Sequence, residues 1–276
     1  MDALSTLPPT FRAVRRNPVL FVVPALLALL QLPQLVLQAV DPFVGGIVSL
    51  LLTGVMILAL PFLQGGLVAM AAEALDGETR LSTLVAAGRT HYVSLFVAFL
   101  VFLGLNTVVF GLVFVGVFLG VVVFVGGAAS PLALATLGLF ALLVFGLYLL
   151  FVFFLQFYAQ AIVVDDLGAF DGLRRSVSVV RANLADTLVY SFIGGGVGAL
   201  FGLFGAVFSL VLTPMPAAGP SPPTVLPVPE PLAGFEPSLA TVAVGFLALV
   251  VVSTLVGALM GTYSVAFYRA VRPTTA

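Results

Sequence analysis

The residues of this chain that could do chemistry are few, and they gather in one stretch, "VVDDLGAFDGLRRSVSVVRANLADTL", residues 163–188. It holds four Asp and three Arg in a chain of which only 8% of the residues are charged. Paired carboxylates could act as a general acid and base, and carboxylates with histidine could hold a metal ion. The chain has one histidine, His91, and no cysteine, which excludes thiolate nucleophiles and cysteine-based metal sites.

The spacing of these residues does not match enzyme motifs. The run "DGLRR", residues 171–175, is close to the start of the motif of phospholipid-forming alcohol phosphotransferases, but its spacing differs and the later paired aspartates are missing. No glycine-rich phosphate loop of the Walker type occurs, and no aspartate lies deep within an apolar stretch. We therefore predict a non-enzymatic protein with no cofactor and no metal site.

The rest of the chain indicates that lipid is its solvent. It is 62% apolar, with a mean hydropathy of +1.27, whereas a soluble domain has roughly 25% charged residues to face water. One bilayer crossing takes about 20 apolar residues. Six stretches reach this length: residues 19–40, 44–72, 93–126, 131–164, 187–213 and 239–267. We predict an all-α polytopic membrane protein whose six transmembrane helices form one domain over residues 1–276.

Arginine predicts the orientation, because basic residues favour the cytoplasmic side. All ten basic residues are Arg, and they flank alternate ends of the six stretches: Arg12, Arg15, Arg16, Arg80, Arg89, Arg174, Arg175, Arg181, Arg269 and Arg272. The opposite connections, including the proline-rich segment 213–238, carry none. We expect a cell-membrane protein with both termini cytoplasmic and segment 213–238 outside. The net charge of −1 favours no nucleic-acid partner.

A short pattern recurs three times, each time before an apolar stretch. It consists of Leu, then Arg eight residues later, then Asn or His two residues after the Arg. The copies are Leu7, Arg15 and Asn17; Leu81, Arg89 and His91; and Leu173, Arg181 and Asn183. Such periodicity predicts repeated structural units. We predict three parallel repeats, each an interfacial helix followed by a two-span hairpin.

The third copy has helical spacing. Leu173, Val177, Val180 and Leu184 fall on one face, with Arg174, Ser178 and Arg181 on the other, and Asp171 is spaced to pair with Arg175. Such a helix lies at the headgroup level with its arginines on lipid phosphates. We expect Arg15, Arg89 and Arg181 to make this contact, and His91 to be a capping or headgroup residue rather than a catalytic one.

The stretches "AIVVDDLGAFDGLRRSVSVVRANLADTL" and "LDGETRLSTLVAAGR" resemble a known family. They are similar to the six-helix membrane domain fused to some glycerophosphoryl diester phosphodiesterases, and look closest to its stand-alone, uncharacterised haloarchaeal type. The resemblance covers nearly the whole chain and implies the same helical fold. The soluble phosphodiesterase barrel is missing here, so the resemblance implies neither that activity nor any catalytic residue.

Two functions fit these features. The first is a protein that organises membrane lipids, or other membrane proteins, through its interfacial arginines. The second is a channel or facilitator for a small or lipidic solute, lined by Asn106, Gln156 and Gln160, although hydrogen bonding between helices is the usual role of such residues. Small residues also recur at four-residue spacing, which favours close helix packing within the chain over self-association: Gly194, Gly198 and Gly202; Gly116 and Gly120; and Ser253, Gly257 and Gly261.

Overall fold

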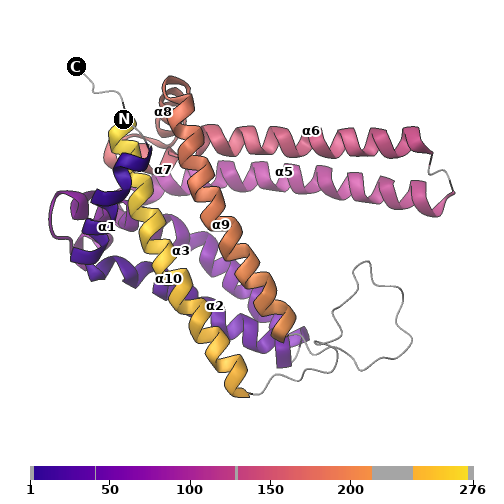
Figure 1. Ribbon diagram of the computed structural model, residues 1–276, viewed down its shortest axis with the longest axis horizontal. Coiled ribbons are helices and arrows are strands. Elements are labelled where there is room, and N and C mark those ends of the chain that lie inside the picture. Colours follow the sequence, from indigo (N-terminus) through magenta and orange to yellow (C-terminus); the bar gives the residue numbers. More distant parts are fainter. Residues whose placement is uncertain (1–2, 41, 128–129, 213–238, 273–276) are drawn as a thin grey trace.

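The computed structural model describes residues 3–40, 42–127, 130–212 and 239–272, which are all-helical apart from short connections (Figure 1). The predicted loop 213–238 lies outside the described residues. The elements of the first half are η1 (Ala3–Thr6), α1 (Leu7–Arg16), η2 (Pro18–Phe21), α2 (Val22–Val40), α3 (Pro42–Asp76), α4 (Leu81–Thr90) and α5 (Tyr92–Val125). Those of the second half are α6 (Pro131–Leu155), α7 (Tyr158–Val164), α8 (Ala169–Ala182), α9 (Leu184–Leu212) and α10 (Leu239–Val271).

Five helices of the described chain are long and apolar enough to cross a membrane. A sixth crossing is counted if α1 and the first part of α2, which meet at an angle of 93°, form one bent span. The helical content and the five or six candidate spans agree with the predicted class. Helices α3 and α5, with 35 and 34 residues, are about 50 Å long at 1.5 Å per residue. Because a bilayer core is roughly 30 Å thick, both exceed what one upright crossing needs.

The predicted span 131–164 is one of the candidate membrane spans, and it contains a local break near its C-terminal end. Helix α6 ends at Leu155 and α7 begins at Tyr158. Ser176 of α8 lies in the break, where its hydroxyl donates to the Phe154 carbonyl oxygen (2.9 Å) and accepts from the Phe157 N–H (3.1 Å). The helix can break here because another segment satisfies the freed backbone groups.

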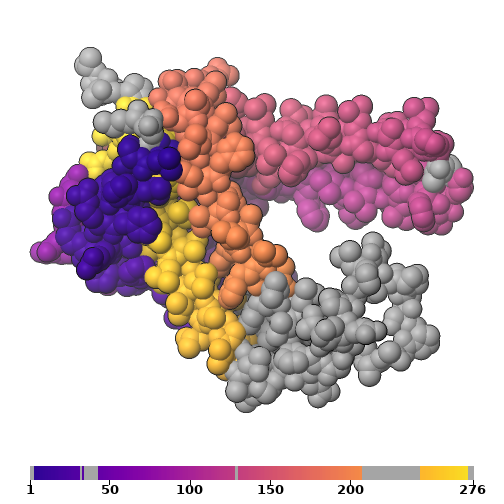
Figure 2. All heavy atoms as spheres, viewed as in Figure 1, coloured from indigo at the N-terminus to yellow at the C-terminus, as the bar shows by residue number. Residues whose placement is uncertain are grey.

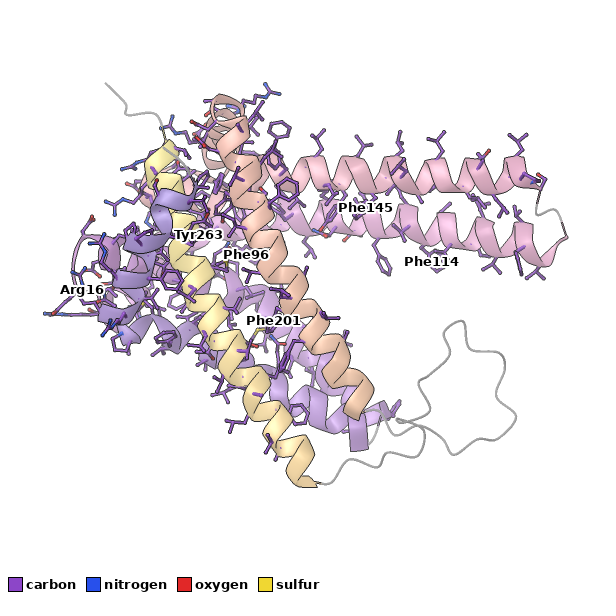
Figure 3. All side chains as sticks on the ribbon, viewed as in Figure 1. Arg16, Phe96, Phe114, Phe145, Phe201 and Tyr263 are labelled. Carbon is purple, nitrogen blue, oxygen red and sulfur yellow. The ribbon has the colours of Figure 1, made fainter. Side chains whose placement is uncertain are left out.

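The long helices form two arms (Figure 1). Helices α2, α3, α9 and α10 run together, and the α5–α6 hairpin projects away from them. Figure 3 labels Phe114 and Phe145 on this hairpin, where both side chains are exposed. Exposed apolar side chains along most of its length are what a lipid-facing hairpin requires.

The buried core lies at one end of the molecule, where the short helices and the C-terminal ends of α3, α7 and α10 meet. Phe157, Phe267 and Tyr268 are fully buried there, and the rings of Tyr190 and Phe267 stack with their centroids 4.6 Å apart. Tyr263, labelled in Figure 3, belongs to the same packed region. We call this the arginine-bearing end, since all arginines of the chain flank helices there.

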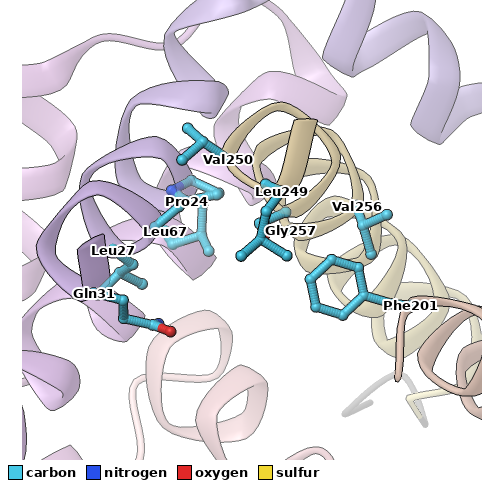
Figure 4. Close-up of a pocket in the computed structure, with 11 residues that line it drawn as sticks. Pro24, Leu27, Gln31, Leu67, Phe201, Leu249, Val250, Val256 and Gly257 are labelled. Atoms are coloured by element: carbon cyan, nitrogen blue, oxygen red, sulfur yellow. The ribbon is translucent and has the colours of Figure 1, made fainter. Parts of the chain in front are cut away.

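Small residues of α10 allow close packing, as predicted. A Cβ atom on Gly257 would lie 2.8 Å from the Pro24 Cβ, and one on Gly261 would lie 3.2 Å from a Leu67 methyl carbon. Gly257 and Pro24 border a cavity of about 420 Å³ between α2, α3, α9 and α10 (Figure 4). In α9, by contrast, a Cβ atom on Gly194 or Gly198 would meet no described atom within 4 Å.

Candidate functional site at the arginine-bearing end

In three places a short helix, α1, α4 or α8, is separated from the next helix by a single residue. We call these three the elbow helices. The single residue at each junction is the C-cap of its elbow helix: Asn17, His91 and Asn183. An arginine named above, Arg15, Arg89 or Arg181, lies in the last turn of each. The local pattern recognised in the sequence therefore coincides with three helix ends.

Asn17 joins the first elbow to the end of α3. Its side-chain nitrogen donates to the carbonyl oxygens of Ala13 (3.0 Å) and Gly77 (3.1 Å), and its side-chain oxygen accepts from the Thr79 N–H (2.9 Å). Only 3% of Asn17 is exposed. The first bond closes its own helix end and the other two hold a distant segment, so Asn17 ties the end of α1 to the segment that follows α3.

Asn183 makes the same two kinds of contact. Its side-chain nitrogen donates to the Val179 carbonyl oxygen of its own helix (3.0 Å) and to the Val271 carbonyl oxygen at the end of α10 (3.0 Å). His91 differs, since its side-chain Nδ1 lies 3.7 Å from a carboxylate oxygen of Asp166, just after α7. Asn17 and Asn183 therefore bind the chain at the end of the second long helix of the hairpin that follows them, α3 or α10, whereas His91 lies beside the turn after α7.

Asp165 is the centre of a polar cluster that connects α7, α8 and α10. Its carboxylate, with 14% of the side chain exposed, accepts hydrogen bonds from Arg272, Tyr268 and Arg175, the last at 3.3 Å. The predicted pairing of Asp171 with Arg175 is therefore wrong. Arg175 turns to the less exposed carboxylate, where the lower dielectric strengthens the pair, and Asp171 instead lies 3.8 Å from Arg174.

Two further arginines close the C-terminal end of α3. Arg269 of α10 donates to the Ala72 carbonyl oxygen (3.0 Å) and pairs with Asp76 (2.9 Å). Arg16 of α1 donates to the Ala74 carbonyl oxygen (3.0 Å). The last carbonyls of a helix lack partners within it and carry partial negative charge. Arg16 provides a partner for one of these carbonyls, that of Ala74, and Arg269 adds a donor to the Ala72 carbonyl one half-turn earlier. The role of both arginines is therefore structural.

The three arginines predicted to hold lipid phosphate are in a different situation. Arg15, Arg89 and Arg181 are exposed, and within the described part of the chain none forms an ion pair with a carboxylate. The guanidinium of Arg181 lies over the Phe154 ring, 5.8 Å from its centroid. Their side chains are thus accessible in the last turns of the three elbow helices.

The predicted lining residues bond to three different neighbours. The Asn106 side chain accepts from the Tyr148 hydroxyl (3.3 Å), that of Gln156 accepts from the Ser191 hydroxyl (3.2 Å), and that of Gln160 donates to the Ser264 hydroxyl (2.9 Å). These pairs connect α5 with α6, the α6–α7 break with α9, and α7 with α10. Gln156 and Ser191 also border a cavity between α6 and α9.

An alignment of the sequence with itself could have predicted part of the Asp165 cluster. The shift of 92 residues that superposes Arg89 on Arg181 also superposes Glu73 on Asp165 and Thr83 on Arg175. In the structure, the Glu73 carboxylate accepts from the Thr83 hydroxyl (2.6 Å), as Asp165 accepts from Arg175. Two acids 92 residues apart, near the ends of α3 and α7, therefore each bind a residue ten positions further along the chain, in α4 and α8.

These features define an all-helical protein with five or six candidate membrane spans. Residues 1–271 match the family described as a domain of unknown function (DUF7847), and the chain belongs to that family. No curated protein and no solved structure matches the chain. The similarity to the membrane domain of glycerophosphoryl diester phosphodiesterases stays a sequence-based hypothesis.

Proposed function

We propose that this chain is a non-enzymatic multi-pass membrane protein that organises lipids or membrane partners, with Arg15, Arg89 and Arg181 contacting lipid phosphates. The observation that carries the proposal is their shared state: all three are exposed in the last turn of an elbow helix, without a carboxylate partner among the described residues. A guanidinium binds phosphate through two parallel hydrogen bonds, and an interfacial helix presents it at the headgroup level.

The proposal includes three related units, each an elbow helix followed by a hairpin. Two sets of contacts support it. Asn17 and Asn183 bind the chain at the ends of α3 and α10, and His91 lies 3.7 Å from Asp166, directly after the span that α6 and α7 form. Glu73 and Asp165 each bind the residue ten positions further along the chain. Three equivalent elbows around one core would present three equivalent phosphate contacts to a single leaflet.

We further propose that both termini face the cytoplasm of a cell-membrane protein, as the arginine distribution predicts. The chain has no cysteine, so single engineered cysteines can be labelled selectively. In intact cells, an impermeant maleimide should label Ser221→Cys, whereas Arg80→Cys and Arg174→Cys should react only after permeabilisation. Labelling of either arginine position from outside would show that the orientation is the opposite one. The three arginines would then not face the cytoplasmic leaflet.

The lipid contact is tested by replacing Arg15, Arg89 and Arg181 together by Gln. Co-purified anionic phospholipid per mole of protein should fall by about tenfold, as expected for the loss of charge-assisted contacts. The matched control replaces Arg12, Arg80 and Arg174 by Gln, which removes the same charge from exposed positions near the same helices. Equal lipid content in both triple variants would reject the proposal, since only general charge would then matter.

The alternative is a channel or facilitator lined by Asn106, Gln156 and Gln160. One observation favours it: the Gln160 side-chain oxygen is buried and has no hydrogen-bond partner among the described residues, which leaves an acceptor for a polar solute. Solute flux in reconstituted vesicles tests this function. An Asn106→Leu or Gln160→Leu variant with undiminished flux would remove that residue from the path.

A further inference from the structure

A groove opens between α6 and α9 on the side where the two arms separate. Its volume is about 770 Å³, within the range of roughly 300–1,000 Å³ that small-molecule sites occupy. Its walls include Gly146, Leu150 and Phe153 on α6, and Leu188, Ser191 and Gly194 on α9. Figure 2 shows the α9 surface next to the α6 hairpin near the arginine-bearing end, with open space between the arms beyond it. The groove is therefore open toward the space where lipid chains would lie.

The groove is polar at one end only. Gln156, directly after the end of α6, and Ser191 of α9 are hydrogen-bonded to each other (3.2 Å) and line it near the arginine-bearing end. Further along, the walls are aliphatic, and the α9 wall includes the bare backbone at Gly194 and Gly195, where a Cβ atom would meet no described atom within 4 Å. This gradient matches a lipid, which is polar at its headgroup and apolar along its chains.

Arg181 does not itself line the groove but is connected to its α6 wall through two aromatic rings. It lies three residues before the start of α9, and its guanidinium covers the Phe154 ring at the end of α6. The Phe154 ring makes an edge-to-face contact with Phe153, which lines the groove, with the ring centroids 5.5 Å apart. Since Arg181 forms no ion pair with a carboxylate in the described chain, its charge is left for an anion at this end.

We propose that the α6–α9 groove holds one hydrocarbon chain of an anionic phospholipid whose phosphate binds Arg181. This inference rests on the proposed function and narrows it to one elbow, one groove and one class of ligand. Charge complementarity selects the lipid over a helix from a second copy, because an apolar helix would fill the groove but offer no anion to the guanidinium of Arg181.

The groove is tested by filling it from both walls. Gly194→Leu places a side chain where the described chain leaves open space, and Leu150→Trp fills the groove from α6. Gly196→Leu is the matched control, since its Cβ atom would also meet open space but Gly196 does not line the groove. For the charge, Arg181→Gln is compared with Arg174→Gln on the same helix.

Binding is measured by native mass spectrometry of delipidated protein with phosphatidylglycerol, and with diacylglycerol, which has the same chains without phosphate. Gly194→Leu, Leu150→Trp and Arg181→Gln should each weaken phosphatidylglycerol binding by about tenfold, while the two controls keep it. Diacylglycerol should bind more weakly and be insensitive to Arg181→Gln, but respond to the two groove-filling variants.

Three outcomes would overturn the inference. Full phosphatidylglycerol binding by both groove-filling variants would show that the lipid chain does not lie in the groove. The proposed function would still be tested separately, by the variant that replaces Arg15, Arg89 and Arg181. An equal loss in Gly196→Leu would show that the groove is not the specific site. A change of oligomeric state in Gly194→Leu with lipid binding intact would assign the groove to a second copy of the chain.

Discussion

The side chain of Asn17 binds the carbonyl oxygen of Gly77, 60 residues away, at 3.1 Å. Asn183 makes the corresponding bond to Val271, 88 residues away, at 3.0 Å. In both cases a neutral amide at the C-cap of an elbow helix binds the chain at the C-terminal end of a long helix, α3 or α10. Arg15 and Arg181 lie two residues before these amides, in helix turns that the amide hydrogen bonds anchor.

Replacing Asn17 by Ala should destabilise the protein. The change removes three side-chain hydrogen bonds and leaves the buried Thr79 N–H without its acceptor. We expect the free energy of unfolding, measured by denaturant titration in mixed micelles, to fall by about 2–3 kcal/mol. Asn106→Ala is the control, because that asparagine is exposed and its replacement removes only the bond to its own helix and the long one from Tyr148, without leaving a buried N–H unpaired. A similar decrease in the free energy of unfolding in the two variants would contradict the role of Asn17 in stabilising the first elbow.

Asp165→Asn should be more damaging than Asp171→Asn. Asp165 compensates both Arg175 and Arg272 in a partly buried cluster, and the amide would remove the negative charge that Asp165 supplies to them. We expect a loss of about 2–3 kcal/mol, below the value for a fully buried pair because the arginines retain some solvent contact. Asp171 is exposed and its pairing with Arg174 is loose, so its variant should unfold like the wild type. Thermal unfolding in detergent distinguishes them.

Ser176→Ala tests the break between α6 and α7. The hydroxyl serves the Phe157 N–H and the Phe154 carbonyl oxygen, and the residue is fully buried. Removing it should cost about 1–3 kcal/mol, the desolvation penalty of groups left unsatisfied. Ser178→Ala on the exposed face of the same helix is the matched control. Equal stability of the two variants would mean that water or a rearranged backbone replaces the hydroxyl.

Substitutions of Asp166 test the backbone conformation of the turn after α7. It is a non-glycine residue with a positive φ of 53°, a conformation that glycine adopts freely and that β-branched residues avoid. Asp166→Val should therefore lower the free energy of unfolding by about 1–2 kcal/mol, whereas Asp166→Gly should not. Asp166→Asn keeps the backbone preference and removes the carboxylate near His91, so it isolates that contact. A valine variant as stable as the glycine variant would exclude backbone strain at this turn.

Much of the architecture could be predicted because it depends on local properties of the chain. Runs of apolar residues define where α3, α5, α9 and α10 lie to within a few residues, since each run must be long enough for lipid. The repeated Leu, Arg and Asn or His marked three helix ends that the structure contains. The break at Gln156 and Phe157 could not be predicted from hydropathy, because both halves are apolar.

What the sequence determined by itself was the class of protein, through its lack of charge, and the positions of the arginines along the chain. The tertiary structure decided which arginines are used internally and which remain exposed. Arg272 and Asp165, separated by 107 residues, become partners only when α7 and α10 pack together. The physical reason is that apolarity acts on each segment separately, whereas an ion pair needs two segments to meet.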